Sequence, residues 1–132
     1  PGREVYANDL KKRFQHLQNV TFQKAIPNSG APNLYRAHAI YVNLTPSGSF
    51  DKTIGEAAAS GCVVVAANEV LRGIVPDALI VDPLSAEDVA RGIDAALKLS
   101  ADERVVLSRK LREYVEREHS LTLLVGKLTA VL

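Results

Sequence analysis

The chain has 132 residues, a size that fits one domain with a single hydrophobic core and requires no disulfide or metal. Its 16 Lys and Arg residues nearly balance 15 Asp and Glu residues, so the net charge of +1 does not favour nucleic acid or an anionic membrane as partner. The single cysteine, Cys62, excludes an intrachain disulfide and is expected to be buried in an apolar run. No run approaches the ~18 apolar residues of a membrane span, and no signal peptide is recognised, so a cytoplasmic location is expected.

The first third of the chain predicts two helices separated by irregular structure. Apolar residues recur at helical spacing over 5–17 with Lys and Arg between them, which indicates an amphipathic helix. Residues 20–23 are a candidate short strand. Pro, Asn and Gly in residues 26–33 predict a loop, which precedes a short helix over 34–38.

Three apolar runs of strand length follow, over 39–44, 62–67 and 78–81. The first two are β-branched and nearly uncharged, which favours strands covered on both faces, as in a parallel sheet. Between them, residues 46–61 predict a loop of small polar residues and then an alanine-rich helix. A strand followed by such a loop and a helix start presents backbone N–H groups to an anion.

Three helices are predicted for the last part of the chain. Ser85, with a weak capping signal from Asp88, begins a helix whose apolar stripe is Val89, Ile93 and Leu97. Ser100 and Glu103 form a stronger capping box that begins a long helix through Glu118. Its inward positions are expected to be Val106, Leu107, Leu111, Tyr114 and Val115. A last apolar helix over 121–132 is expected to pack against this domain or another part of the protein, because its one basic residue argues against a membrane-surface role.

The alternation of strands and helices predicts right-handed βαβ units and a doubly wound α/β fold with a parallel sheet flanked by helices. Neither the Gly-x-Gly-x-x-Gly dinucleotide fingerprint nor the P-loop motif is present. A doubly wound domain normally begins with a strand, whereas this chain begins with a helix pattern. We therefore expect a Rossmann-like domain truncated at its N-terminal edge, with further strands outside these 132 residues.

From about residue 20 to 119 the chain carries several short motifs in a specific order. These are a Val-x-Phe strand, a Leu-Tyr pair before a strand, a Pro-Ser loop, a Glu-Ala-x-Ala-x-Gly helix, a Val-Val-x-Ala strand and a Val-x-Pro turn. This order resembles the C-terminal, nucleotide-sugar-binding domain of retaining GT-B glycosyltransferases of the family-4 type, also called group 1 glycosyl transferases.

The resemblance implies that residues 1–132 are a single Rossmann-like donor-binding domain, one half of a GT-B fold. Such enzymes transfer a sugar from a nucleoside-diphosphate sugar to an acceptor, which can be a sugar, a lipid or a polysaccharide. They require no cofactor and no obligatory metal. The acceptor-binding domain and the family's Arg and Lys pair have no counterpart here, so we expect this chain alone to be inactive. The full-length enzyme is expected in the cytoplasm or peripherally at the inner membrane.

The family's Glu-x7-Glu signature is only half present. Glu56 matches its second Glu, and the resemblance therefore assigns Glu56 to the ribose hydroxyls of the donor. Gly48 stands where the family has the Glu that contacts the donor sugar, while Phe50 keeps its family position. Ser47, Ser49 and Lys52 are candidate donors to the diphosphate or the sugar.

Each of these assignments has a structural alternative. Thr53 and Glu56 have capping-box spacing, so Glu56 could serve only to cap its helix. Residues 47–51 could simply connect a strand to a helix, and Lys52 could pair with Asp51 at the surface. Asn68, at the carboxyl end of a predicted strand, could touch the nucleotide or cap the next helix.

A rival function is a non-catalytic nucleotide-binding or interaction module that keeps the fold, which the glycine at position 48 favours. The three histidines have no metal-ligand spacing, so no metal site is expected. An exposed edge of the truncated sheet is expected to favour a homo-oligomer.

Overall fold

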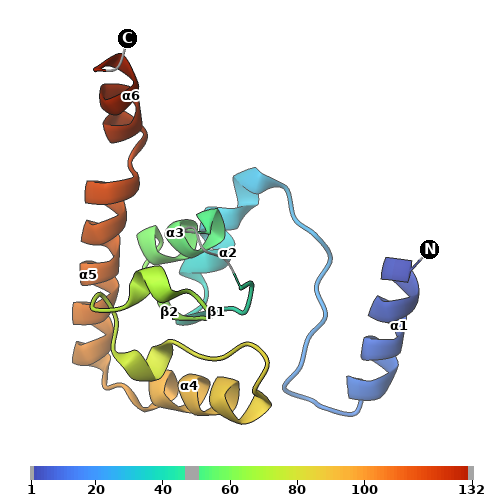
Figure 1. Ribbon diagram of the computed structural model, residues 1–132. Coiled ribbons are helices and arrows are strands. Elements are labelled where there is room, and N and C mark those ends of the chain that lie inside the picture. The colour runs from blue at the N-terminus through green and yellow to red at the C-terminus, as the bar shows by residue number, and fades with distance from the viewer. Residues whose placement is uncertain (1, 47–50, 131–132) are drawn as a thin grey trace.

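The computed structural model describes residues 2–46 and 51–130. It is a mixed α/β structure in which a small parallel sheet lies between helices (Figure 1). The helices and strands are α1 (Gly2–Phe14), α2 (Ala31–Arg36), β1 (Ile40–Asn43), α3 (Lys52–Ala59), β2 (Val63–Ala66), α4 (Ala86–Lys98), α5 (Ala101–His119) and α6 (Leu121–Thr129). Among the described residues, no helix is long and apolar enough to cross a membrane.

The sheet is built around β2, the most deeply buried element. Residues 63–66 are each at most 1% exposed, because helices cover both faces of the strand. β1 pairs with β2 in parallel, from Ile40 opposite Val63 to Asn43 opposite Ala66. These pairings confirm the strands predicted over 39–44 and 62–67.

The two faces of the sheet are covered by different helices. On one face α4 lies close to β2, and a Cβ placed on Gly92 would lie 3.1 Å from Val65 Cγ1. α2 and α3 lie on the other side of the sheet, and α5 runs alongside α3 (Figure 1). The core therefore joins β2 with apolar residues of α3, α4 and α5, including Ile54, Ala96 and Leu111.

A tight turn delivers the chain from α3 directly into β2. Gly61 has φ +100°, a left-handed conformation that side chains disfavour. The N–H of Gly61 donates to Ala58 O at 3.0 Å, and the N–H of Cys62 donates to Ala57 O at 3.0 Å, which is the Schellman pattern. This turn buries Cys62, as the sequence predicted.

Two of the predicted strands are wrong or incomplete. Residues 20–23 form no strand, because a cavity of about 530 Å³, lined by Thr21, Gln23 and Val42 among others, separates this segment from β1. Residues 78–81 hold only one bridge, between Ile80 and Ala66. A single turn of 3-10 helix, Asp77–Leu79, takes up the start of that run because it follows Pro76.

The helices agree better with the sequence, although three expectations about packing are wrong. The helix predicted over 5–17 exists as α1, but Val5 is 69% exposed and the helix stands apart from the sheet (Figure 1). Leu97 of α4 and Val106 of α5 are 58% and 54% exposed, because the faces that meet the core carry Gly92 and Ala96, and Leu107 and Leu111. The apolar residues of α6 are likewise exposed, so this helix does not pack against the described part of the chain.

Candidate functional site

The N-terminus of α3 lies beyond the carboxyl end of β1, and its cap is Asp51. The Asp51 side chain accepts from the N–H of Thr53 at 2.8 Å and from its hydroxyl at 2.7 Å. The capping box predicted between Thr53 and Glu56 is therefore wrong, because an Asp two positions earlier provides the cap. Glu56 is not used as the cap of its own helix.

Capping by Asp51 also changes what this helix start offers to an anion. The N–H groups of Ile54 and Gly55 donate to Asp51 O at 3.0 and 3.3 Å, so the first turn has few free donors. Hydrogen bonds from the hydroxyl and then the N–H of Thr53 lower the pKa of Asp51, which keeps this carboxylate ionised. A diphosphate would meet a negative charge at this point.

A polar network below the helix start holds Asp51 and Thr53 in place. Asn43, at the end of β1 and only 8% exposed, donates from Nδ2 to Thr53 Oγ1 at 3.1 Å. The Tyr41 hydroxyl donates to the same oxygen at 2.8 Å. Asn43 Oδ1 accepts from the N–H of Thr45 at 2.9 Å. Residues on both sides of the segment between β1 and α3 are thus tied to one buried side chain.

Glu56 lies one turn further along α3, facing α2. Lys52 Nζ lies 3.2 Å from Glu56 Oε1, and the Tyr35 hydroxyl donates to Oε2 at 3.5 Å. The Glu56 side chain remains 38% exposed, and the long contact from Tyr35 leaves its second oxygen accessible to a better donor. Burial raises the pKa of Tyr35, and the nearby Tyr41 and Glu56 add to this effect.

A shallow cavity of about 330 Å³ opens between α2 and α3 beside Glu56. Its polar lining includes Asn28, Tyr35, Arg36 and Ser60. Volumes of this size are typical of the smaller ligand-binding clefts. The cavity therefore combines one accessible carboxylate with neutral and cationic hydrogen-bond donors.

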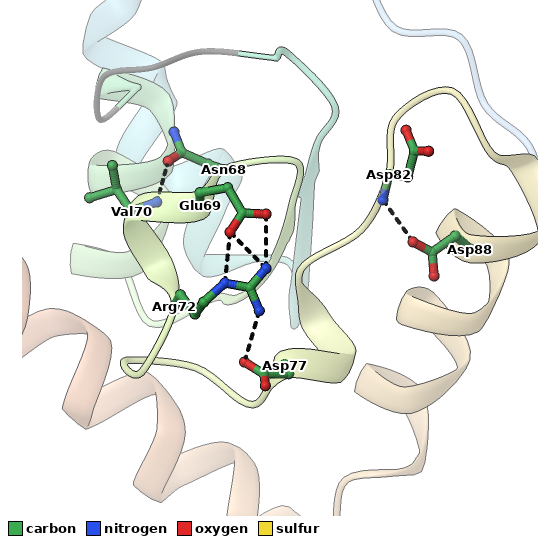
Figure 2. Close-up of polar contacts among 7 residues, drawn as sticks. All are labelled: Asn68, Glu69, Val70, Arg72, Asp77, Asp82 and Asp88. Atoms are coloured by element: carbon green, nitrogen blue, oxygen red, sulfur yellow. Dashed lines mark hydrogen bonds and ion pairs between the residues drawn. The ribbon is translucent and has the colours of Figure 1, made fainter.

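Asn68 begins the connection at the carboxyl end of β2 (Figure 2). It is fully buried, and its Oδ1 accepts from the N–H of Val70 at 3.0 Å. This contact caps the 3-10 turn Glu69–Leu71, which is the structural role weighed above. Whether a nucleotide also contacts Asn68 stays a prediction.

The turn after Asn68 is closed by exposed ion pairs. Figure 2 shows the Arg72 guanidinium between Glu69, at 2.7 Å, and Asp77, at 3.6 Å. The hydrogen bond with Arg72 lowers the pKa of Glu69. In the same view the Asp82 N–H donates to Asp88 Oδ2 at 2.7 Å, which joins the bridge segment to the start of α4. These contacts hold loops and leave no carboxylate pair arranged for acid–base chemistry.

The structure brings together only some of the residues predicted for the site. Lys52, Thr53 and Glu56 lie on the first turns of α3, whereas Asn68 follows β2. Ser47, Gly48, Ser49 and Phe50 lie outside the described residues. The sequence interpretation missed Asn43 and the capping role of Asp51, although Asp is among the most favoured N-cap residues.

Comparison with known proteins identifies the family. The model of the family "Glycosyl transferases group 1" matches residues 2–99, which is well over half of the chain. The chain belongs to this glycosyltransferase family. No curated protein and no solved structure matches the chain. The matched range of this glycosyltransferase domain contains β1, β2 and the whole of α3, and thus every described candidate residue.

The cap of α3 gives the glycosyltransferase domain a testable acid dependence. We expect Asp51→Ala to lower the free energy of unfolding by about 0.5–2 kcal/mol at pH 7. Asp51→Asn should retain most of the stability, because Asn is an equally good cap. Since the folded-state pKa of Asp51 is lowered, its charge contributes stability above the unfolded-state pKa and loses it as the pH falls through the folded value.

Urea denaturation of the three proteins between pH 7 and pH 3 measures this effect. The difference between wild type and Asp51→Asn should shrink on acidification. An Asp51→Ala protein as stable as wild type at pH 7 would contradict the assignment of the cap.

Proposed function

We propose that this domain is the C-terminal, nucleotide-sugar-binding half of a retaining GT-B glycosyltransferase, with a doubly wound sheet completed by strands outside these residues. Membership of the group 1 family supports glycosyl transfer as the chemistry. The observation that carries the donor-site assignment is that Asp51, and not Thr53 with Glu56, caps α3. Glu56 is thereby available to accept hydrogen bonds from the ribose hydroxyls, and a carboxylate can take two such bonds at once.

The proposed donor site divides the nucleotide sugar among neighbouring groups. Glu56 accepts from the ribose, and the ammonium of Lys52, which is 81% exposed, is within reach of the diphosphate. Ser47 and Ser49 are proposed as hydroxyl donors, with Gly48 and Phe50 beside them, and Asn68 as a contact to the base or sugar. Because Asp51 occupies the helix cap, most of the positive charge for the diphosphate must come from other parts of the protein.

In this proposal the sugar is transferred with retention of its anomeric configuration on one face of the donor. The negative charge that develops on the leaving diphosphate is stabilised by preorganised hydrogen-bond donors and cations. No metal and no general base of this chain takes part in the step. The acceptor, a sugar, a lipid or a polysaccharide, binds to a second domain, so the isolated chain should bind the donor without turning it over.

Calorimetric titration of the chain with UDP, GDP and ADP tests the proposal. We expect preference for one nucleotide, weakened at least ~10-fold in Glu56→Ala, equivalent to about 1.4 kcal/mol. The control Glu116→Ala, an exposed glutamate of α5, should bind like wild type. Urea denaturation should show at most about 1 kcal/mol of destabilisation in Glu56→Ala, because only an exposed ion pair is lost.

Two outcomes would count against this function. Absence of binding to all three nucleotides would remove the donor-site assignment. Equal affinities of wild type and Glu56→Ala would move the nucleotide away from Glu56. The glycine at position 48 favours one alternative, a module that binds nucleotides without transferring sugar. Such a module would bind the nucleoside diphosphate but gain nothing from an attached sugar.

A further inference from the structure

The described part of α3 and its cap presents three charged groups in a regular order. From the cap into the helix these are the carboxylate of Asp51, the ammonium of Lys52 and the carboxylate of Glu56. At about 1.5 Å of rise per residue, the two carboxylates are separated by about 7 Å along the helix axis. Lys52 lies between them and pairs with Glu56 at 3.2 Å.

Asp51 is held so that its two oxygens differ. Oδ1 accepts both hydrogen bonds from Thr53, at 2.8 and 2.7 Å. Among the described residues, Oδ2 receives only a long contact of 3.4 Å, from Asn43 Nδ2. A carboxylate has about four acceptor sites, so Oδ2 retains capacity for a further donor. The side chain is only partly buried, which leaves this oxygen within reach of a ligand.

A nucleotide sugar has a matching sequence of parts. Its ribose carries neutral hydroxyls, its diphosphate is anionic, and its sugar again carries neutral hydroxyls. An ionised carboxylate repels the diphosphate but accepts strong, charge-assisted hydrogen bonds from hydroxyl groups. With the ribose at Glu56 and the diphosphate near Lys52, the part of the ligand that suits the position of Asp51 is the transferred sugar.

We propose that Asp51 binds a hydroxyl of the donor sugar through Oδ2 and is a specificity-determining residue of the donor site. The inference rests on the proposed function, because it needs the ribose at Glu56. The contacts from Thr53 and Asn43 orient the carboxylate before the ligand arrives, so little ordering remains to be done on binding. Asp51 thus combines two roles, as the cap of α3 through Oδ1 and as a sugar acceptor through Oδ2.

Titration with paired ligands tests this inference. UDP, GDP and ADP are compared with UDP-glucose, GDP-glucose and ADP-glucose, using wild type, Asp51→Asn and Glu56→Gln. Asp51→Asn keeps a good helix cap but replaces the ionised carboxylate by a neutral amide. We expect it to weaken binding of the preferred nucleoside-diphosphate glucose at least ~10-fold and to change binding of the free nucleoside diphosphate less than twofold. Glu56→Gln should weaken both ligands.

The control is Asp102→Asn, an exposed Asp in the first turn of α5, which should change neither affinity. Equal losses for the two ligands in Asp51→Asn would show that Asp51 acts only through the shape of the helix start, and no loss would remove it from the site. Either result overturns the inference while the donor site at Glu56 stands. If wild type binds none of the six ligands, the proposed function and this inference both fail.

Discussion

Leu111→Ala is expected to lower the free energy of unfolding by about 2–5 kcal/mol. Leu111 is fully buried on α5, at the contact between this helix and the core. Truncation removes apolar surface from the core and leaves a cavity that the packed helices α3 and α5 cannot fully close. Because domains of this size are typically stable by only about 5–15 kcal/mol, the variant should lie close to its unfolding limit.

Val106→Ala on the same helix is the matched control. The hydrophobic pattern places both residues on the inward face, but Val106 is 54% exposed. Its truncation should change stability by at most about 0.5 kcal/mol, since the loss of partly buried surface is offset by the higher helix propensity of Ala. Urea denaturation followed by circular dichroism measures both variants. Similar losses in the two would contradict the observed orientation of α5.

Gly92→Ala is expected to destabilise the domain by overpacking the contact between α4 and the sheet. The added Cβ would lie 2.4 Å from Val81 Cγ1 and 3.3 Å from the backbone oxygen of Ala78. Relieving such a clash costs about 1–3 kcal/mol, which exceeds the gain of about 1 kcal/mol from replacing Gly in a helix. A net loss of stability is therefore expected, together with a displacement of α4.

Gly126→Ala separates the packing effect from helix propensity. Gly126 lies in α6, and a Cβ there would meet no atom within 4 Å. This variant should be neutral or slightly more stable in the same denaturation experiment. A stabilised Gly92→Ala protein would show that α4 does not approach β2 as closely as the structure indicates.

The elements that sequence alone predicted well are those whose signal is local or whose environment is uniform. The capping box of Ser100 and Glu103 is confirmed, because both of its hydrogen bonds form between residues three apart. β2 is confirmed because an unbroken run of buried β-branched residues suits few other structures. The family was likewise recognisable from the order of short motifs, before any contact was known.

Only the tertiary structure decided which of several local signals is used. Asp51 and Thr53 are both acceptable caps for α3, and the contacts that Asn43 and Tyr41 make from β1 favour the Asp. An apolar stripe on a helix marks an approximate face, but the position of the neighbouring strand decides that Leu111 is buried and Val106 is not. Residues 20–23 have the composition of a strand and still lack a ladder, because pairing requires a partner edge within hydrogen-bonding distance. Propensity and motif order thus determined which elements form and to which family the chain belongs, while distances between elements remote in sequence decided which side chains are free to bind a ligand.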